Sequence, residues 1–272
     1  MKKVSFQGEH GAYSESAAKK FFEEEIETVP CSSFEDVLEL TDNGESDYSI
    51  LPVENSIEGT VGQSIDAITN TNLHAVGEKY LKVEHCLISN GSFEDIETVY
   101  SHPQALGQCS DFIKMRKLKT VPTYDTAGSV KIIKEINDKT SAAIASKDAG
   151  KLYNISIVKE GIENNTNNYT RFLIFSKMNL GEETNDKTSI IFSVKHEPGA
   201  LYQILKEFND NDINLTKIES RPNKNTNWEY NFFVDFLGHS SNSKIKLVLD
   251  NIEKNTIFNL WGVSWERPVR HY

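Results

Sequence analysis

The sequence predicts an α/β protein with two domains, a large one of alternating strands and helices and a small ferredoxin-like one. The chain has 272 residues, which is enough for about two domains. Short β-rich segments alternate with amphipathic helical ones as far as about residue 176, a pattern typical of an α/β domain with much parallel sheet. The polar, aperiodic segment 177–187 follows, and the order of elements then changes. We therefore place the domains at 1–177 and 188–267, with a linker at 178–187.

Local patterns mark the elements of the first domain. Val4–Phe6 has the residue types of a strand, and Ser14 opens a helix with apolar residues gathered on one face. Ser33 and Asp36 match a capping box, which predicts the start of the next helix. The other expected strands lie at 48–53, 99–101, 120–124, 142–145 and 171–175, and the other expected helices pass through 61–68, start at 103 and at 126, and end at 153.

The second domain is expected to have the order βαββαβ. Its strands are expected at 188–194, 214–221, 230–237 and 258–265, and its helices at 199–208 and 244–252. This order over about 80 residues is the ferredoxin-like arrangement. Taken alone, Glu197–Leu201 is a tight turn, and Glu219–Pro222 is a strand end with an edge proline.

Charge and hydropathy argue against several classes of protein. The formal net charge is −11 and the few arginines are scattered, whereas a nucleic-acid surface needs clustered basic residues. Apolar stretches are a few residues long, far short of the ~20 that span a bilayer. Met1–Lys3 leads directly into a strand-like segment, so we expect no secretion signal. Cys31, Cys86 and Cys109 are widely spaced, which favours reduced thiols in the cytoplasm, without disulfide or structural zinc.

Polar clusters that directly follow predicted strands are the candidate ligand sites, because ligands of open α/β sheets bind beyond the carboxyl ends of the strands. Such clusters occur at 8–14, 54–60, 101–108, 125–129 and 168–172. Each alone is also explained by helix capping or by turns. Together they predict four helix N-termini on one rim, which would bind an anion such as a carboxylate through backbone N–H groups.

The sequence lacks the common cofactor motifs. Gly8 and Gly11 lack the third glycine of a dinucleotide fingerprint, and neither a phosphate-binding loop nor a GxSxG elbow occurs. His74, His85 and His102 do not have metal-ligand spacing. We therefore expect neither a nucleotide nor a metal cofactor.

The clusters together resemble the prephenate dehydratase family with its regulatory ACT domain. The matching segments cover essentially the whole chain in the correct order: GEHGAYSESAA at 8–18, LPVENSIEGTV at 51–61, SHPQALGQC at 101–109, DTA at 125–127, NYTRFL at 168–173, GAL at 199–201 and ESRP at 219–222. Two departures are visible. Ser129 and Val130 stand where the family often has alanines, and Ala12 stands where it often has threonine.

The resemblance implies decarboxylation of prephenate with loss of its ring hydroxyl, which gives phenylpyruvate, carbon dioxide and water without a cofactor. It implies a catalytic domain of two lobes, like a periplasmic binding protein, with the site in the cleft between them. It also implies an ACT domain that binds L-phenylalanine as feedback inhibitor, at a subunit interface of a homodimer or homotetramer. Because the first strand begins at Val4, we expect no chorismate mutase domain, which some family members carry.

The family motifs also imply site residues. Arg171 is expected to hold a substrate carboxylate, Thr170 to contact the leaving hydroxyl by hydrogen bonding or proton relay, and Gln108 to orient the substrate. The remaining catalytic candidates are Asn55 and Ser101, and the substrate-binding candidates are Ser14, Ser56 and Thr126. Glu54 and His102 are alternative proton donors, unless they are an ordinary strand-end carboxylate and a helix cap. The expected L-phenylalanine contacts are Gly199, Ala200, Leu201, Asn214, Glu219, Ser220, Arg221 and Pro222.

Two other functions fit the same sequence. One is a lyase acting on arogenate, whose amino group replaces the keto oxygen of prephenate. The other is a non-catalytic solute-binding protein, since the two-lobed fold also serves binding alone. The ACT-like segment and the expected absence of a secretion signal speak against the second.

Overall fold

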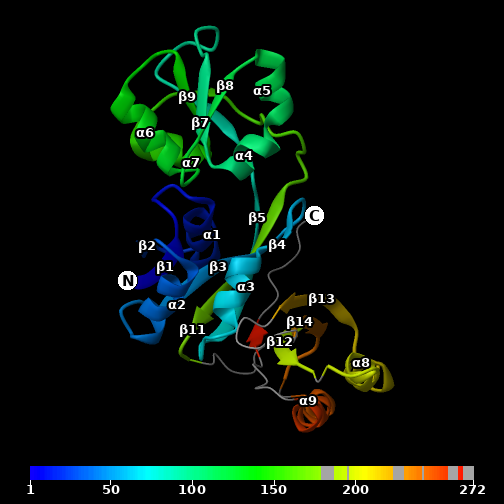
Figure 1. Ribbon diagram of the computed structural model, residues 1–272. Helices are drawn as coiled ribbons and strands as arrows, with labels where there is room; N and C mark the ends of the chain where they lie inside the picture. The colour runs from blue at the N-terminus through cyan, green and yellow to red at the C-terminus, as the bar shows by residue number, and fades with distance from the viewer. Residues whose placement is uncertain (179–186, 195, 223–229, 241, 257–262, 266–272) are drawn as a thin grey trace.

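The computed structural model describes residues 1–178, 187–194, 196–222, 230–240, 242–256 and 263–265, which form two lobes and a C-terminal unit (Figure 1). The sheet of the first lobe has the strand order β2–β1–β3–β11–β5. Strand β1 (Lys2–Gln7) is parallel to β2 (Ile26–Cys31) and β3 (Tyr48–Asn55), whereas β11 (Tyr169–Ser176) is antiparallel to β3 and to β5 (His74–Lys82). The short β4 (Gly59–Thr60) pairs with β3.

Helices cover both faces of this sheet. On one face α1 (Tyr13–Phe22) packs through Ala17 and Ala18 against Phe6, Phe172 and their neighbours. On the other face α2 (Phe34–Asp42) and α3 (Gly62–Ile68) pack against a second apolar cluster. Ser33 Oγ accepts from the Asp36 N–H at 3.1 Å and the Asp36 carboxylate accepts from the Ser33 N–H at 3.2 Å, which confirms the predicted capping box.

The second lobe is a sheet of order β10–β6–β9–β7–β8. Strand β7 (Thr98–Ser101) is parallel to β8 (Lys119–Pro122) and β9 (Ser141–Ala145), and β6 (Cys86–Ile88) is antiparallel to β9 and to β10 (Ile157–Lys159). Helices α4 (Pro103–Gln108) and α5 (Ser110–Arg116) cover one face, and α6 (Gly128–Ile136) and α7 (Lys147–Tyr153) cover the other. The chain crosses into this lobe after β5 and returns after β10.

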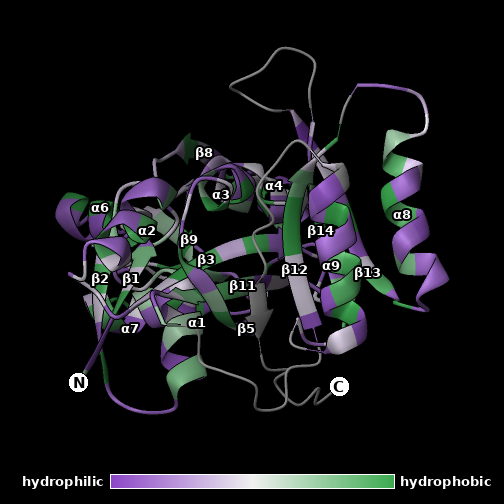
Figure 2. Ribbon diagram, turned by 90° about the horizontal axis from the view of Figure 1, so that it is seen from below, coloured by the Kyte–Doolittle hydropathy of each residue, from purple (hydrophilic) through white to green (hydrophobic). Residues whose placement is uncertain are grey.

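The C-terminal unit contains β12 (Lys187–Ser193), α8 (Ala200–Asp210), β13 (Leu215–Pro222), β14 (Tyr230–Leu237), α9 (Ser243–Asn255) and β15 (Val263–Trp265). The strand order β13–β14–β12–β15 is the ferredoxin-like one. Residues Phe192 and Phe236 face the two helices, whose amphipathic character is visible in Figure 2. Residues Ile191 and Phe233 face the other way and join the apolar core of the first lobe.

The predicted fold class is confirmed, but several strands were not predicted. Strand β11, which was predicted at 171–175, lies inside the first sheet, between β3 and β5, and is antiparallel to both. The unpredicted β5 contains Gly77 and the buried Glu78, which break an apolar–polar alternation, and the unpredicted β2 is an edge strand with Pro30. Lys187, expected to end the linker, is the first residue of β12. Residues 179–186 of the expected linker and 258–262 of the expected last strand lie outside the described residues. None of the described helices is long and apolar enough to span a bilayer.

Candidate active site

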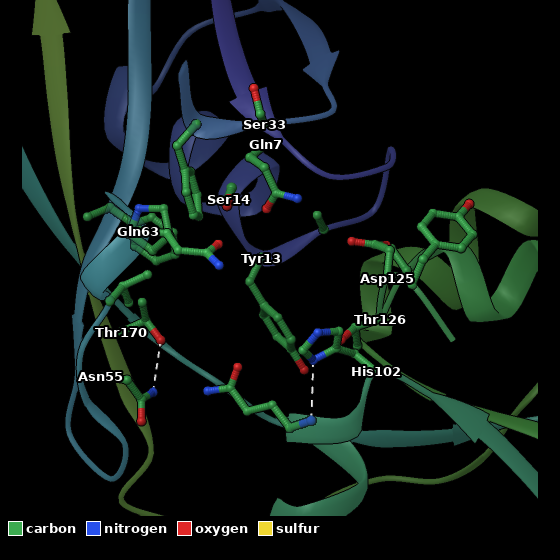
Figure 3. Close-up of a pocket in the computed structure, with 18 of the residues that line it drawn as sticks. Gln7, Tyr13, Ser14, Ser33, Asn55, Gln63, His102, Asp125, Thr126 and Thr170 are labelled. Carbon is green, nitrogen blue, oxygen red and sulfur yellow. Dashed lines mark hydrogen bonds between the residues drawn. The ribbon is translucent and has the colours of Figure 1, made fainter. Parts of the chain in front are cut away.

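A cleft of about 440 Å³ lies between the two lobes and is lined by residues of both (Figure 3). Within the described residues, six helices begin at this cleft. The lining residues at these helix starts are Gly11 to Ser14 for α1, Ser32 to Glu35 for α2, Val61 and Gln63 for α3, His102 and Gln104 for α4, Asp125 to Ala127 for α6, and Ser146 for α7. The expected convergence of helix N-termini is therefore confirmed, with six helices in place of four.

The cleft offers an anion backbone N–H groups and hydroxyl groups but no cationic side chain among the described residues. Among the described residues that line it, none is lysine or arginine. Helix α1 has no side-chain cap, so its first backbone N–H groups and the Ser14 hydroxyl remain for a ligand. A carboxylate in this cleft would thus be held by helix N-termini and hydroxyl groups.

Thr170 and Asn55 lie side by side on the cleft wall, on the paired strands β11 and β3 (Figure 3). The Asn55 Oδ1 atom accepts from the backbone N–H groups of Ile57 and Glu58, both at 3.0 Å, which fixes the orientation of the amide. Asn55 Nδ2 therefore donates, and it lies 3.0 Å from Thr170 Oγ1. Because this oxygen accepts from Asn55, the Thr170 hydroxyl proton is left to donate to a ligand in the cleft.

A chain of hydrogen bonds extends from Asn55 behind the cleft wall. Asn55 Nδ2 lies 2.7 Å from Asn168 Oδ1, and Asn168 Nδ2 donates to Gln108 Oε1 at 3.0 Å. Gln108 Oε1 is 2.9 Å from His85 Nε2, and His85 Nδ1 is 3.1 Å from the Tyr13 hydroxyl. Burial lowers the pKa of His85 more than its hydrogen bond to Gln108 raises it, so the ring is neutral at pH 7. The chain holds the Asn55 amide in place.

Sequence reasoning did not select Asn168 and His85 as site residues. Asn168 stands in the matched segment NYTRFL, two residues before Thr170, and this place in the motif is the signal that could have indicated it. His85 has no such signal, because its partner Gln108 is 23 residues away and in another element.

The predicted residues Ser14, Asn55, Thr126 and Thr170 line the cleft, but Ser101, Gln108 and Ser56 do not. The buried Ser101 hydroxyl donates to the Ile144 carbonyl at 2.6 Å, inside the second lobe. Ser56 Oγ donates to the Asn167 carbonyl at 2.9 Å and accepts from the Tyr169 N–H at 2.9 Å. In place of the expected substrate contacts, each of these side chains forms hydrogen bonds to other groups of the protein.

Arg171 does not face the cleft, contrary to expectation. It follows Thr170 on β11, and successive side chains of a strand point to opposite faces. Its guanidinium lies 2.7 Å from the Glu78 carboxylate and 2.5 Å from that of Asp235 in β14, and 3% of the side chain is exposed. Burial lowers the pKa of this group, but the charges of Asp235 and Glu78 outweigh burial and raise it above its usual value. The expected contact of Arg171 with a substrate carboxylate is therefore wrong.

The two alternative proton donors have other partners. The Glu54 carboxylate faces the C-terminal unit, 2.9 Å from Lys217 Nζ, and does not line the cleft. His102 lines the cleft, but its Nδ1 accepts from the Gln104 N–H at 3.2 Å and so caps α4, as the ordinary interpretation expects.

Asp125 is an acidic group of the cleft that was not predicted individually. Burial raises the pKa of its carboxyl, and hydrogen bonds from the N–H groups of Gly128 and Ala127 lower it by less. Its Oδ1 accepts from the Gly128 N–H at 2.7 Å. A carboxyl with this shift can carry a proton at a higher pH than an ordinary aspartic acid.

Contacts near Gly11 join the lobes beside the cleft. Ser146 Oγ donates to the Gly11 carbonyl at 2.6 Å, and Ser16 Oγ donates to Asp148 at 2.7 Å. Gly11 has a φ of 91°, and a Cβ atom added to it would lie 2.7 Å from the Cα of Ala149. Both the backbone conformation and the close packing of the lobes therefore require glycine.

The Glu15 carboxylate holds the loop before α1. Its Oε2 accepts from the Gly11 N–H at 2.6 Å, and its Oε1 accepts from Thr28 at 2.7 Å and Lys19 at 2.8 Å. Burial raises the pKa of Glu15, but these hydrogen bonds together lower it to about 2. Glu15 is therefore ionised and fully paired at neutral pH.

The expected L-phenylalanine contacts lie on two segments of the C-terminal unit. Gly199 caps α8 with a φ of 86°, directly before Ala200 and Leu201. Asn214 precedes β13, and Glu219 to Pro222 form its end. Arg221 differs from the expectation, because its guanidinium pairs at 3.2 Å with Asp66 of α3 in the first lobe.

Comparison with known proteins gives the family. Residues 4–179 match the family model described as prephenate dehydratase. The chain belongs to the prephenate dehydratase family. Residues 188–254 match the ACT domain, so the C-terminal unit is an ACT domain.

Relatives of this chain carry names of three kinds: bifunctional chorismate mutase/prephenate dehydratase, prephenate dehydratase and arogenate dehydratase. The "Prephenate dehydratase" of Methanocaldococcus jannaschii is 40% identical over 260 residues, which cover 93% of this chain and 94% of that protein. The "Arogenate dehydratase/prephenate dehydratase 2, chloroplastic" of Arabidopsis thaliana is 38% identical over 269 residues, 94% of this chain and 70% of the plant protein. The crystal structure of prephenate dehydratase from Arthrobacter aurescens in complex with L-Phe superposes with a TM-score of 0.88 at 28% identity, over 97% of this chain and 90% of that one.

Proposed function

We propose that this protein converts prephenate to phenylpyruvate, carbon dioxide and water, as a carbon–oxygen lyase in L-phenylalanine biosynthesis. The observation that carries the proposal is the Thr170 hydroxyl, which lines the cleft and accepts from Asn55 Nδ2 at 3.0 Å, so that its proton is left to donate to a substrate. A dehydratase needs such a donor because hydroxide is a poor leaving group. The family membership and the names of the relatives support the same reaction.

In this reaction the C–O bond of the ring breaks and the leaving hydroxyl takes up one proton from the solvent, which gives water. The electrons of the bond to the ring carboxylate complete the aromatic ring, and carbon dioxide leaves. Thr170 stabilises the departing oxygen by a hydrogen bond, since a threonine hydroxyl is too weak an acid to serve as a tuned general acid at neutral pH. The helix N-termini hold the side-chain carboxylate, and positioning and electrostatics supply much of the acceleration.

We further propose that L-phenylalanine binds the ACT domain and inhibits the enzyme, in a homodimer or homotetramer. The named L-Phe complex of the Arthrobacter relative supports this. Gly199 at the start of α8 leaves the helix N-terminus open to a carboxylate, since there is no side-chain cap.

The test is turnover of prephenate and of arogenate by the purified protein, with phenylpyruvate and phenylalanine separated by chromatography. We expect phenylpyruvate from prephenate at the higher kcat/KM. A higher kcat/KM for arogenate would replace the proposal by an arogenate lyase, and tight binding of prephenate without turnover would replace it by a binding protein. Dialysis against a chelator should leave the rate unchanged. A loss of activity that a divalent ion restores would refute the cofactor-free reaction.

A further inference from the structure

The residues directly beside Thr170 and Asn55 are held by the ACT domain. Strands β11 and β3 pair with Thr170 opposite Asn55 and Arg171 opposite Glu54. The first pair lines the cleft. The second pair points to the other side of the sheet, toward the ACT domain, because neighbouring side chains on a strand alternate.

Arg171 is bound by the centre of the ACT sheet. The Asp235 carboxylate of β14 lies 2.5 Å from its guanidinium and is fully buried, and it also accepts a hydrogen bond from Ser189 of β12. Lys187 Nζ of β12 lies 3.3 Å from Glu78, the other partner of Arg171. Charges buried this deeply need their partners close by, so the ACT strands define where Arg171 sits.

Glu54 is bound by the edge of the same sheet. Its carboxylate lies 2.9 Å from Lys217 Nζ of β13, which also lies 3.1 Å from Thr60 Oγ1. On the same strand Arg221 pairs with Asp66 and packs so closely on Gly62, at the start of α3, that a Cβ atom there would lie 2.6 Å from its Cζ. The neighbours of Gly62 line the cleft. Strand β13 thus contacts both β3 and α3 immediately behind the cleft wall.

Apolar packing makes this contact continuous. Leu173 and Phe175 follow Arg171 on the same face of β11, and they share one core with Ile191 and Phe233 of the ACT sheet. The pairing of β11 with β3 is irregular between Arg171 and Phe172, and such bulges re-aim side chains near active sites. The position of Thr170 therefore depends on the ACT residues that pack against the opposite face of β11.

We propose that Arg171 and Glu54 are positioning residues, through which the Asp235 and Lys217 side chains of the ACT domain set the geometry of Thr170 and Asn55 in the cleft. The inference rests on the proposed function, because it concerns the same hydroxyl donor. A ligand that displaced β13 or β14 would then act on the cleft through these ion pairs.

The test neutralises the ACT side of each ion pair, Asp235→Asn and Lys217→Met, and leaves the cleft residues unchanged. Asp210→Asn and Lys206→Met are matched controls, because they make the same substitutions in an exposed ion pair of α8 in the same domain. Lys217→Arg keeps the charge. We expect kcat to fall about tenfold in Asp235→Asn and about fivefold in Lys217→Met, with KM within about twofold, because a misplaced donor acts on the transition state. The controls and Lys217→Arg should stay within about twofold of wild type.

Hydrogen exchange of the segments 50–56 and 168–173 gives a readout that does not depend on turnover. Exchange should be faster in Lys217→Met and Asp235→Asn than in wild type and in the controls. Unchanged kcat and exchange in Lys217→Met, which breaks a pair whose Glu54 side chain is 39% exposed, would overturn the inference even if Asp235→Asn fails to fold. Equal losses in Lys206→Met would overturn it too. A wild-type protein without turnover would instead overturn the proposed function, and the exchange rates would then decide the inference alone.

Discussion

Replacing Thr170 by valine removes one hydroxyl group at nearly constant shape. The structural cost is small, because Asn55 Nδ2 keeps Asn168 Oδ1 at 2.7 Å and the Tyr169 carbonyl at 3.3 Å as acceptors. We therefore expect the free energy of unfolding to change by about 1 kcal/mol or less, the usual net value of one hydrogen bond.

The chemical cost of Thr170→Val should be much larger. The hydroxyl is expected to bond the departing oxygen mainly in the transition state, and one lost donor of that kind lowers kcat by about 10² to 10³. This is about 2.7 to 4 kcal/mol of transition-state stabilisation, and KM should change by less than about threefold.

The assay is the initial rate of phenylpyruvate formation over a range of prephenate concentrations, for wild type, Thr170→Val and Thr170→Ser. Serine keeps the hydroxyl and should retain kcat within about tenfold. A valine variant with kcat within about threefold of wild type would refute the role of the hydroxyl. A large loss of kcat in valine accompanied by unfolding at the assay temperature would point to a structural role instead.

Three further substitutions test other parts of the structure. Glu15→Gln should lower Tm at pH 7 by roughly 4 to 8 °C, for about 2 kcal/mol of lost charged hydrogen bonds. The pKa of Glu15 is about 2 in the folded protein, below its ordinary 4.5, so the carboxylate stabilises the folded state above pH 4.5. The difference in Tm between wild type and Glu15→Gln should therefore narrow as the pH falls toward 2. A difference that stays constant with pH would contradict this. Gly11→Ala should lower Tm and raise KM, since its Cβ would lie 2.7 Å from Ala149 Cα where the lobes meet. Thermal unfolding measures the first effect and steady-state kinetics the second. Wild-type values of both Tm and KM would contradict the close packing. Gly199→Val strains a residue at a φ of 86°, and we expect the L-phenylalanine concentration for half-inhibition to rise about tenfold or more; unchanged inhibition would place the effector elsewhere.

Part of the fold follows from short-range signals. The capping box of Ser33 and Asp36 and the helix start at Pro103 depend on residues within one helical turn, so they could be predicted from the sequence. The order of strands and helices in the ACT domain could also be predicted from the sequence. The family motifs then indicated Thr170 and Asn55, and the structure places both on the cleft wall.

The position of Arg171, the next residue of the same motif, could not be predicted from the sequence. A strand sequence indicates that Thr170 and Arg171 point to opposite faces, but which face borders the cleft depends on where β11 lies in the sheet and on what covers it. Strand β5 was missed for a related reason. Its buried Glu78 is stable only because Arg171 and Lys187, 93 and 109 residues away in sequence, supply the opposite charge.

The sequence by itself therefore determined the family, the order of the two domains and two polar residues of the cleft, Asn55 and Thr170. The tertiary structure alone decided that the arginine beside them serves the ACT domain. The physical reason is that charge pairing across domains depends on three-dimensional contact, which local sequence patterns do not predict.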